Sequence, residues 1–392
     1  MLTRLVARDF RNFAHLDIAV PARGVVIVGE NGHGKTNLLE AAAYLSLLRS
    51  MRGARDVDMI RFGAPALHVR ADLAVPARAH GVSVGYERST RRKKATLDGV
   101  EQSRLTAALG ALPSVGFSPA DVSLVAGSPG DRRRYLDVAL ALSSRVYLAA
   151  LQQFRAALLR RNAVLRQAQR DGGARGTPFV EQVSIWEPVL AEQGALVTAI
   201  RQQFVRGHVD RFSQLASAIG ERQVVSMRYS VSSGSVGGAS AGASSIDESL
   251  LDGELTALAA SYRELFTRAL AQQRPQEMRR GATLVGPHRD ELALLLGGRE
   301  LRTFGSAGQQ RSAAIALRLL ELATLRETIG GTPLLLLDDP FAELDLGRAG
   351  RVLALLEDAG VDQVLLAVPR VEDIPEAFTR LERRVMCDGV LT

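Results

Sequence analysis

A run of eight residues near the amino end has the make-up of a phosphate-binding loop. Residues 29–36 read GENGHGKT and match the pattern G-x-x-x-x-G-K-[ST] at every fixed position. Glycines let the backbone curl so that successive N–H groups point at phosphate oxygens. Lys35 would add a positive charge for the β- and γ-phosphates, and Thr36 would offer a hydroxyl to Mg²⁺. The run therefore predicts a site for a nucleoside triphosphate with Mg²⁺.

The residues around the loop fit a strand before it and a helix after it. Residues 24–28 form a short apolar run, and residues 37–49 carry apolar side chains at helical spacing. Only three of the 49 Lys and Arg residues are lysines, and Lys35 is one of them. A planar guanidinium is too broad for the phosphate slot, which explains a lysine there. We expect nucleotide contacts at Gly29, Asn31, Gly32, Gly34, Lys35, Thr36 and Asn37.

A second element of the site is the apolar run 334–337, which is followed by Asp338 and Asp339. A buried strand would place Asp338 at its carboxyl end, beside the phosphate loop. There Asp338 and Thr36 would hold Mg²⁺ directly or through water. Asp339 would orient or activate the water that attacks the γ-phosphate, so Asp339 and Lys35 are the candidate catalytic residues. Taken alone, these residues could equally be a strand that ends in an acidic turn.

A small, polar, glycine-containing turn precedes a long apolar helix in the last third of the chain. Residues 305–311 read GSAGQQR, and residues 312–317 begin the helix. Such a turn at a helix N-terminus is able to bind an anion. The simpler interpretation is a helix cap in which Ser306 is the capping residue.

The order of these elements resembles that of ABC-type ATPase heads. A phosphate loop, a long insert, a small-residue signature turn and an acidic strand are followed by Glu343-Leu344-Asp345. In such heads the signature turn covers the nucleotide held by a second subunit. Because this chain carries one copy of each half, the resemblance implies an ATP-dependent homodimer. Further nucleotide contacts are then expected at Ser306, Gly308, Gln309 and Asp345.

Hydrophobic periodicity outlines the elements that position these groups. Period-two patterns predict strands over 2–10, 16–20, 66–73 and 82–87 and near 95–97, with the first of them at a sheet edge. Composition predicts helices over 131–170, 181–219 and 249–273. Residues 230–245 are nearly all Ser, Gly, Ala and Val, which is typical of a flexible loop.

The fold class that follows is α/β. We expect an ABC-type ATPase head, with a mixed sheet and a phosphate loop, split by a mainly helical second lobe. Residues 1–115 and 281–392 would form the two parts of the ATPase lobe, and residues 116–280 the helical lobe, including the loop near 230–245.

Composition and charge narrow the class of protein. The net charge is +7 and the sequence pI is about 10.0, which suits a polyanionic partner such as nucleic acid. No stretch of 18 apolar residues is present, so we expect no membrane span. The single cysteine, Cys387, allows no internal disulfide and no CxxC metal site. With no signal-peptide pattern at the N-terminus, these features predict a cytoplasmic protein.

Basic clusters are the candidate contacts for a nucleic acid. Residues 91–94 (RRKK) are expected in a hairpin turn, and residues 132–134 (RRR) open the long helix, where cations oppose the helix dipole and call for an acidic partner or ligand. Each cluster could equally be a solvated surface. Aromatic residues make up only 5% of the chain, so a stacking platform for single-stranded bases is not supported. His33 is interpreted as a tolerated residue of the phosphate loop, and His288 as a structural or interfacial residue rather than a metal ligand.

Seven stretches resemble the RecF family of DNA replication and repair proteins. They cover residues 8–13, 29–36, 117–121, 127–137, 286–290, 306–311 and 336–345. The stretches 127–137 and 286–290 discriminate most, because general ABC heads lack them. The resemblance implies ATP-dependent dimerisation, binding to gapped or junction DNA, and cooperation with RecO and RecR in loading RecA. It also implies a weak, DNA-stimulated ATPase that acts mainly as an ATP-switched clamp.

Two departures from the ABC pattern concern hydrolysis, and one departure from the family's pattern concerns the signature turn. ABC heads usually carry a Gln after the first helix, yet none lies between Lys35 and Gln102. The last core strand runs into residues 367–369 (AVP), which leaves no obvious sensor for the γ-phosphate, and Ala307 replaces the first Gln of the family's signature turn. Slow hydrolysis with intact ATP binding is therefore expected. The alternative classes are an ABC transporter subunit and a chromosome-organising coiled-coil ATPase.

Overall fold

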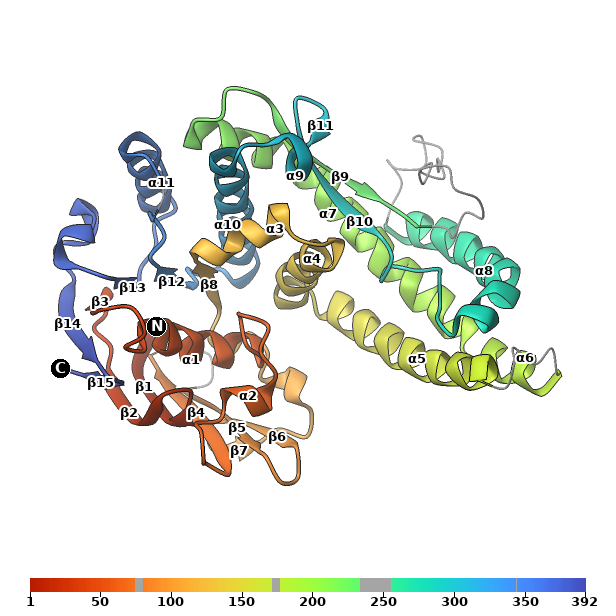
Figure 1. Ribbon diagram of the computed structural model, residues 1–392, viewed down its shortest axis with the longest axis horizontal. Coiled ribbons are helices and arrows are strands. Elements are labelled where there is room, and N and C mark those ends of the chain that lie inside the picture. Colours follow the sequence, from red (N-terminus) through yellow and green to blue (C-terminus); the bar gives the residue numbers. More distant parts are fainter. Residues whose placement is uncertain (75–79, 171–176, 233–254, 343) are drawn as a thin grey trace. The chain divides into compact units, whose positions relative to one another are not determined.

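The computed structural model describes the chain except for residues 75–79, 171–176, 233–254 and 343 (Figure 1). The chain divides into two compact units, one of residues 1–122, 218–221 and 311–392 and the other of residues 123–217 and 222–310. From residue 233 onwards, the Ser/Gly loop expected at 230–245 lies outside the described residues. The division expected from the sequence, an ATPase lobe of residues 1–115 and 281–392 and a helical lobe of residues 116–280, stays a prediction.

The first unit contains a six-stranded sheet in which strands distant in sequence lie side by side (Figure 1). Its order is β15-β14-β3-β13-β12-β8, and β14, β3, β13, β12 and β8 run parallel. The strands are β3 (Gly24–Val28), β8 (Ser114–Phe117), β12 (Leu334–Asp338), β13 (Val364–Val368), β14 (Glu382–Cys387) and β15 (Val390–Leu391). Because they are parallel, the carboxyl ends of β3, β12 and β8 meet at one edge.

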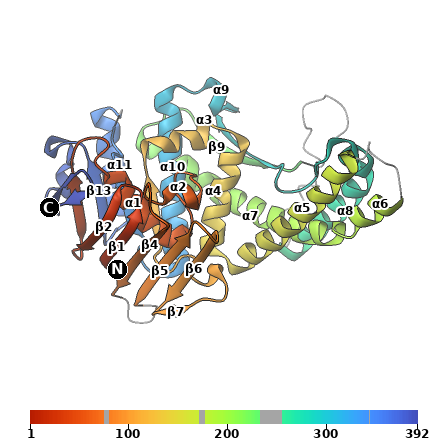
Figure 2. The ribbon, with the colours of Figure 1, turned by 60° about the horizontal axis from the view of Figure 1, so that its bottom comes forward.

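A second, antiparallel sheet has the order β2-β1-β4-β5-β6-β7, with its strands side by side in Figure 2. The strands are β1 (Leu2–Phe10), β2 (Phe13–Ala19), β4 (Ala66–Leu73), β5 (Gly81–Glu87), β6 (Arg92–Leu97) and β7 (Val100–Glu101). The expectation that the N-terminal strand lies at a sheet edge is wrong, because β1 pairs with both β2 and β4. Its alternating pattern indicates one buried face and says nothing about its neighbours.

The core of the first unit lies between these sheets and α1 (Lys35–Leu47). Leu38, Ala42 and Leu45 on α1 are fully buried and belong to one cluster with residues of β1, β3 and β4. Gln363 ties the two sheets together, since its side chain accepts from Leu2 N (2.8 Å) and donates to Leu2 O (2.7 Å). This arrangement fixes the start of α1 relative to the edge where the parallel strands end.

The other elements of the first unit are helical and mostly short. They are α2 (Asp56–Met59), α11 (Leu346–Asp358) and the 3-10 turns Leu105–Ala107, Pro119–Val122, Val371–Asp373 and Glu376–Phe378. Helix α10 (Ala307–Ile329) has its first turn in the second unit and continues into the first.

The second unit is mainly helical. Its helices are α3 (Ser123–Ala126), α4 (Pro129–Ser143), α5 (Arg145–Arg170), α6 (Thr177–Ser184), α7 (Glu187–Ile219), α8 (Leu255–Arg280) and α9 (Leu301–Phe304). A three-stranded antiparallel sheet of order β11-β10-β9 completes it, with β9 (Val225–Ser230), β10 (Glu291–Leu296) and β11 (Arg299–Glu300). Among the described helices, none combines the length and apolarity needed to cross a membrane.

The continuous helix expected over 131–170 is two helices that meet at Ser144. Ser144 adopts an extended conformation, and its N–H bonds Leu140 O (2.8 Å) at the end of α4. Its hydroxyl accepts from Tyr147 N (3.1 Å) at the start of α5. One serine therefore closes one helix and begins the next, which a search for Gly and Pro does not detect.

Candidate nucleotide site

The predicted phosphate loop connects β3 to α1, as the sequence indicates. Gly32 and Gly34 have φ angles of +90° and +108°, where other residues are strained. A Cβ on Gly34 would lie 2.6 Å from the Asn12 amide nitrogen, and one on Gly29 would lie 2.3 Å from Met386 O. Gly29 and Gly34 are therefore required by their close neighbours as well as by the loop. Asn31 is exposed at the tip.

Lys35 turns its ammonium group back onto the loop. Its Nζ donates to Gly29 O and to Glu30 O, the latter at 2.9 Å. Burial lowers the pKa of Lys35, and the charges of Asp338 and Asp339 oppose that shift. These carbonyl contacts hold the ammonium in place at the loop, where phosphate oxygens would be stronger acceptors than carbonyls.

Thr36 and Asp338 meet across the sheet edge. The Thr36 hydroxyl donates to Asp338 Oδ1 at 3.0 Å. Burial raises the pKa of Asp338, the Thr36 hydrogen bond and the Arg52 charge lower it, and the neighbouring Asp339 raises it. The structure thus brings together the two groups that the sequence assigned to Mg²⁺. A hydroxyl and a carboxylate are hard oxygen donors, which fit this metal.

Asp339 follows directly and leaves the strand in a left-handed conformation, with φ of 46°. Its N–H still bonds Ala367 O of β13 (2.9 Å), so the residue is anchored at the edge of the sheet. Non-glycine residues in this region are uncommon and concentrate at functional sites. Its expected role toward water stays a prediction.

A polar cluster that the sequence did not reveal forms hydrogen bonds with the phosphate loop and with the start of α1. Asn12, at the β1–β2 turn, donates to His33 O (3.3 Å) and accepts from Asn37 (2.8 Å). Arg52 donates to Asn37 Oδ1 (3.3 Å) and lies 3.7 Å from the buried carboxylate of Glu40. Arg52 therefore brings a half-exposed positive charge close to Asp338. Its only signal in the sequence is an arginine shortly after the loop helix.

The signature turn lies in the second unit and forms a reciprocal helix cap. Ser306 N donates to Gln309 Oε1 (2.9 Å), and Gln309 N donates to the Ser306 hydroxyl (3.3 Å). The Gln310 amide donates to Gly305 O (3.2 Å) and Arg302 O (3.1 Å). The capping interpretation of Ser306 is confirmed. The nucleotide contacts expected at Ser306, Gly308 and Gln309 remain predictions.

Asp345 is the N-cap of α11, where its carboxylate accepts from Arg348 N at 2.9 Å. The side chain is exposed, so the nucleotide contact expected there remains a prediction as well. Glu343, which was singled out with it, lies outside the described residues.

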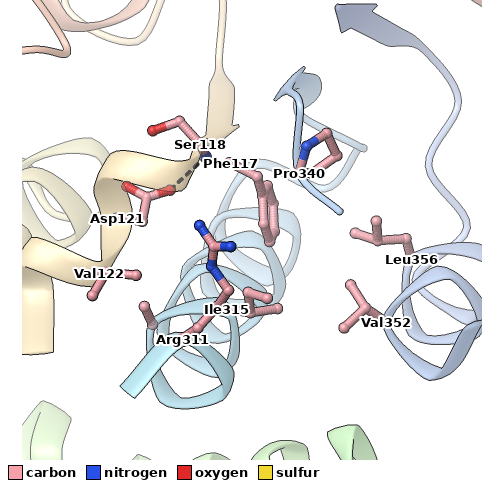
Figure 3. Close-up of a pocket in the computed structure, with 10 residues that line it drawn as sticks. Phe117, Ser118, Asp121, Val122, Arg311, Ile315, Pro340, Val352 and Leu356 are labelled. Carbon is pink, nitrogen blue, oxygen red and sulfur yellow. Dashed lines mark hydrogen bonds between the residues drawn. The ribbon is translucent and has the colours of Figure 1, made fainter. Parts of the chain in front are cut away.

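A pocket beside the acidic turn links that turn to the start of α10. Figure 3 shows Arg311 of α10 close to Phe117 and Pro340. The Arg311 guanidinium donates to Ala342 O, and Asp121 accepts from Ser118 N (2.7 Å). The loops that follow β8 and β12 are therefore both fastened at this edge of the sheet.

One of the two basic clusters differs from its expected setting, and the other has the acidic partner that was expected. The hairpin turn ends at Arg91, and β6 begins at Arg92. Lys93 points inward, forms an ion pair with Asp56 (2.7 Å) and donates to Leu48 O (2.7 Å). Arg132 is buried and pairs with Glu291 at 2.8 Å, which supplies the expected acidic partner at the start of α4. Neither Lys93 nor Arg132 is available to a nucleic acid.

The two histidines singled out in the sequence have protein partners. His33 Nδ1 lies 3.3 Å from Met386 O, and His288 Nε2 lies 3.1 Å from Thr283 O. Burial lowers the pKa of His288 to about 4. No group of three or more His, Cys, Asp or Glu residues with the geometry of a metal site occurs in the described part of the chain.

The fold and this edge define a P-loop ATPase head of the ABC type. A model of the RecF/RecN/SMC N terminal domain family matches residues 1–381. Two solved structures are similar over 100% of this chain at 26% identity: the recombination mediator protein RecF-ATPrS in the RecFOR pathway (TM-score 0.82, 97% of that chain) and RecF-ATP (0.81, 96%). A Smc head domain with an extended coiled coil from Pyrococcus furiosus shares the fold, with a TM-score of 0.50 at 16% identity, over 100% of this chain and 95% of that chain.

Relatives named DNA replication and repair protein RecF align over nearly the whole chain. The relative from Renibacterium salmoninarum is 33% identical over 100% of this chain and 99% of its own length. The relative from Rhodococcus erythropolis is 36% identical over 95% of this chain and 90% of its own length. The relative from Halalkalibacterium halodurans is 35% identical over 91% of this chain and 90% of its own length. The chain belongs to the RecF family. The expected α/β ABC-type head is thereby confirmed.

Proposed function

We propose that this chain is an ATP-switched DNA-binding protein of recombinational repair. In this proposal, ATP drives formation of a homodimer that binds gapped or junction DNA in the cytoplasm and acts with RecR and RecO to load RecA. Family membership supports this function over the transporter and chromosome-organising alternatives. The RecF-ATP relative supports ATP as the nucleotide.

The observation that carries the proposal is the approach of Thr36 to Asp338 beside Lys35. The loop amides and Lys35 would bind the β- and γ-phosphates, while Thr36 and Asp338 would hold Mg²⁺. When bound, Mg²⁺ would neutralise phosphate charge. Asp338 would be the single carboxylate ligand of the metal. That number suits Mg²⁺, which takes most of its other ligands from phosphate and water.

The chain's own residues would then divide the work. Lys35 would exchange its loop carbonyls for phosphate oxygens, which are stronger acceptors. Asp339 would accept a hydrogen bond from water and orient it toward the γ-phosphate. Ser306, Gly308 and Gln309 of a second copy would supply the rest of the site. With no Gln after the first helix and an apolar end to β13, hydrolysis would be slow.

The test is the mass of the protein in solution, measured by light scattering with ATP and Mg²⁺, with ADP, and without nucleotide. ATP should give the dimer, and gapped duplex should bind to it in preference to a single strand of the same length. A chain that stays monomeric at saturating ATP, or that binds DNA equally well without nucleotide, contradicts the proposal.

A further inference from the structure

Arg8 and two histidines form one row across the exposed face of the antiparallel sheet. Arg8 on β1 lies directly opposite His15 on β2 and opposite His68 on β4. All three side chains are exposed, whereas their neighbours Ala7, Leu16 and Val69 are buried on the other face. Neighbouring strands lie about 4.8 Å apart, so the three groups share a strip about 10 Å wide.

The strip continues across the sheet. Opposite His68 lies Gly85 on β5, which has no side chain, and opposite Gly85 lies Lys94 on β6. A Cβ on Gly85 would meet only His68 and a backbone oxygen, so nothing covers the sheet there. Because the three side chains of the row are exposed, the strip is accessible to an extended, rigid partner.

The positive charge of the row is not cancelled by the acids around it. Asp17 is paired with Arg4 (2.5 Å), Asp72 with Arg70 (2.8 Å), and Glu101 with Lys94 (2.8 Å). Glu87, on the diagonal from His68, accepts from Thr90 (2.7 Å). In the described part of the chain, no side chain forms an ion pair or hydrogen bond with Arg8. Arg8 is therefore a surplus cation between two titratable rings.

The electrostatics of the neighbours agree with a positive strip. Removal from water lowers the pKa of His68, and the charges of Arg8 and Arg70 lower it further. The pKa of Asp17 is lowered chiefly by its Arg4 hydrogen bond, with contributions from His15 and Arg8. His15 faces Arg8 and Asp17. His68 faces Arg8, Arg70 and Gly85, so a polyanion on the strip would oppose the lowering of the His68 pKa by the two arginines.

We propose that the row His15–Arg8–His68 binds the phosphodiester backbone of duplex DNA. This assignment rests on the proposed DNA-binding function and names the surface that carries it. Phosphate is the matching chemistry, because Arg8 supplies a forked, permanently charged donor and each histidine adds a donor when protonated. Duplex fits better than a single strand, because the row and its continuation through Gly85 and Lys94 offer no Phe, Tyr or Trp side chain for stacking. Contacts of this kind are independent of base sequence.

The test compares the triple variant Arg8→Gln, His15→Asn, His68→Asn with the unaltered chain in ATP and Mg²⁺. Binding to a fluorescent gapped duplex is titrated between about 50 and about 200 mM salt and between about pH 8 and about pH 6. In the unaltered chain, affinity should rise as the pH falls, because the bound phosphates favour protonation of the rings. Arg8→Gln alone should reduce the salt slope by about 1. The triple variant should also lose most of the pH response.

Two controls separate the row from general charge effects. Arg23→Gln removes the same charge from an exposed loop residue before β3. The double variant Arg4→Gln, Asp17→Asn removes a neutral pair from the same sheet face. Both should keep the pH response and bind within about twofold of the unaltered chain, as expected for surface changes that leave the row intact.

The outcomes distinguish this surface from the proposed function. If the triple variant keeps ATP-dependent duplex binding with an unchanged pH response, the assignment of the row is wrong. The proposed DNA-binding function is not affected by that result. Absence of ATP-dependent duplex binding in the unaltered chain overturns both. The same variants are also titrated with polyglutamate as an acidic-protein probe. If the triple variant loses polyglutamate binding but keeps duplex binding, the row binds an acidic protein and the DNA assignment is overturned.

Discussion

Thr36 donates its hydroxyl hydrogen bond to Asp338 across 3.0 Å, although 302 positions separate the two residues in the chain. One stands in the first turn of α1 and the other at the end of β12. The sequence places each in a motif of its own, and only the parallel order of β3, β13 and β12 brings them together. The predictions about nucleotide binding and hydrolysis concern residues close to this pair.

Lys35→Ala should weaken ATP binding by about 10- to 100-fold, because charge-assisted hydrogen bonds to phosphate are lost. Lys35→Arg should restore little, since a planar guanidinium does not fit the slot. Calorimetric titration with ATP and Mg²⁺ measures both. Lys94→Ala, at an exposed lysine paired with Glu101, is the matched control and should bind ATP normally.

Asp339→Asn should bind ATP and dimerise but lower the hydrolysis rate by about 100-fold, the usual contribution of a positioned acid or base. The amide keeps the shape of the side chain and loses its capacity to accept a proton. Phosphate release under single-turnover conditions gives the rate, and light scattering gives the mass. An unchanged rate would remove Asp339 from the mechanism.

Ser306→Arg should block ATP-dependent dimerisation and spare ATP binding by the monomer. A long cation at the signature turn would clash with a second subunit, while the phosphate loop is built from the first unit alone. Light scattering and calorimetry on the same sample separate the two effects. Ser306→Ala removes only the cap, so it should cost about 1 kcal/mol of stability at most and leave dimerisation measurable. Dimers of the arginine variant would exclude this turn from the interface.

Arg52→Gln should move the acid limb of the ATPase pH profile to higher pH. Burial raises the pKa of Asp338, and the Arg52 charge is one of the influences that lower it. Only the ionised carboxylate holds a metal, so activity falls as pH drops through that pKa. Removing Arg52 raises the pKa further. Arg55→Gln, at an exposed residue paired with Asp58, should leave the profile in place.

The same raised pKa has a consequence for stability in the absence of ligand. An ionised Asp338 costs folding free energy above its folded-state pKa, and this cost disappears as pH falls through that pKa. The Asp338→Asn variant should therefore match the unaltered chain at low pH and exceed it at neutral pH, by thermal unfolding without nucleotide. A smaller stability at neutral pH would contradict the assigned direction.

Arg201→Met should destabilise the second unit by about 3–5 kcal/mol, because the buried carboxylate of Asp137 loses a partner 2.6 Å away. Arg201 also donates to Pro287 O (2.8 Å), so it joins the two stretches that discriminate the family. The only tryptophan, Trp186, reports on this unit by fluorescence during urea unfolding. Arg155→Met removes the half-exposed partner of Asp137 and should cost about 1 kcal/mol or less.

The parts of the site that sequence reasoning predicted are those encoded in contiguous residues. The phosphate loop, its flanking strand and helix, and the strand ending at Asp338 each carry a complete local signal. Asn12 and Arg52 carry no such local signal, because each acts through a hydrogen bond with Asn37, which lies elsewhere in the chain. A residue that acts through a distant partner cannot be recognised by its own spacing.

The same limit explains the corrections to the fold. The alternating pattern of β1 indicates which face is buried, but β4, more than fifty residues later, decides that β1 is internal. Lys93 stands in a run of four cations, and only the position of Asp56 shows that it is paired within the protein. Ser144 divides one helix into two through its hydroxyl and its extended backbone, a signal weaker than Gly or Pro.

The strand order of the nucleotide-binding sheet also constrains when the site is able to form. Strand β3, which leads into the phosphate loop, is flanked on both sides by strands from the last thirty residues of the chain, β13 and β14. A growing chain displays the loop early, yet β3 has no partner strand in this sheet until β13 and β14 have been made. Contacts this distant in sequence slow folding. During translation, the phosphate loop is therefore made long before the two strands that hold β3 in the sheet.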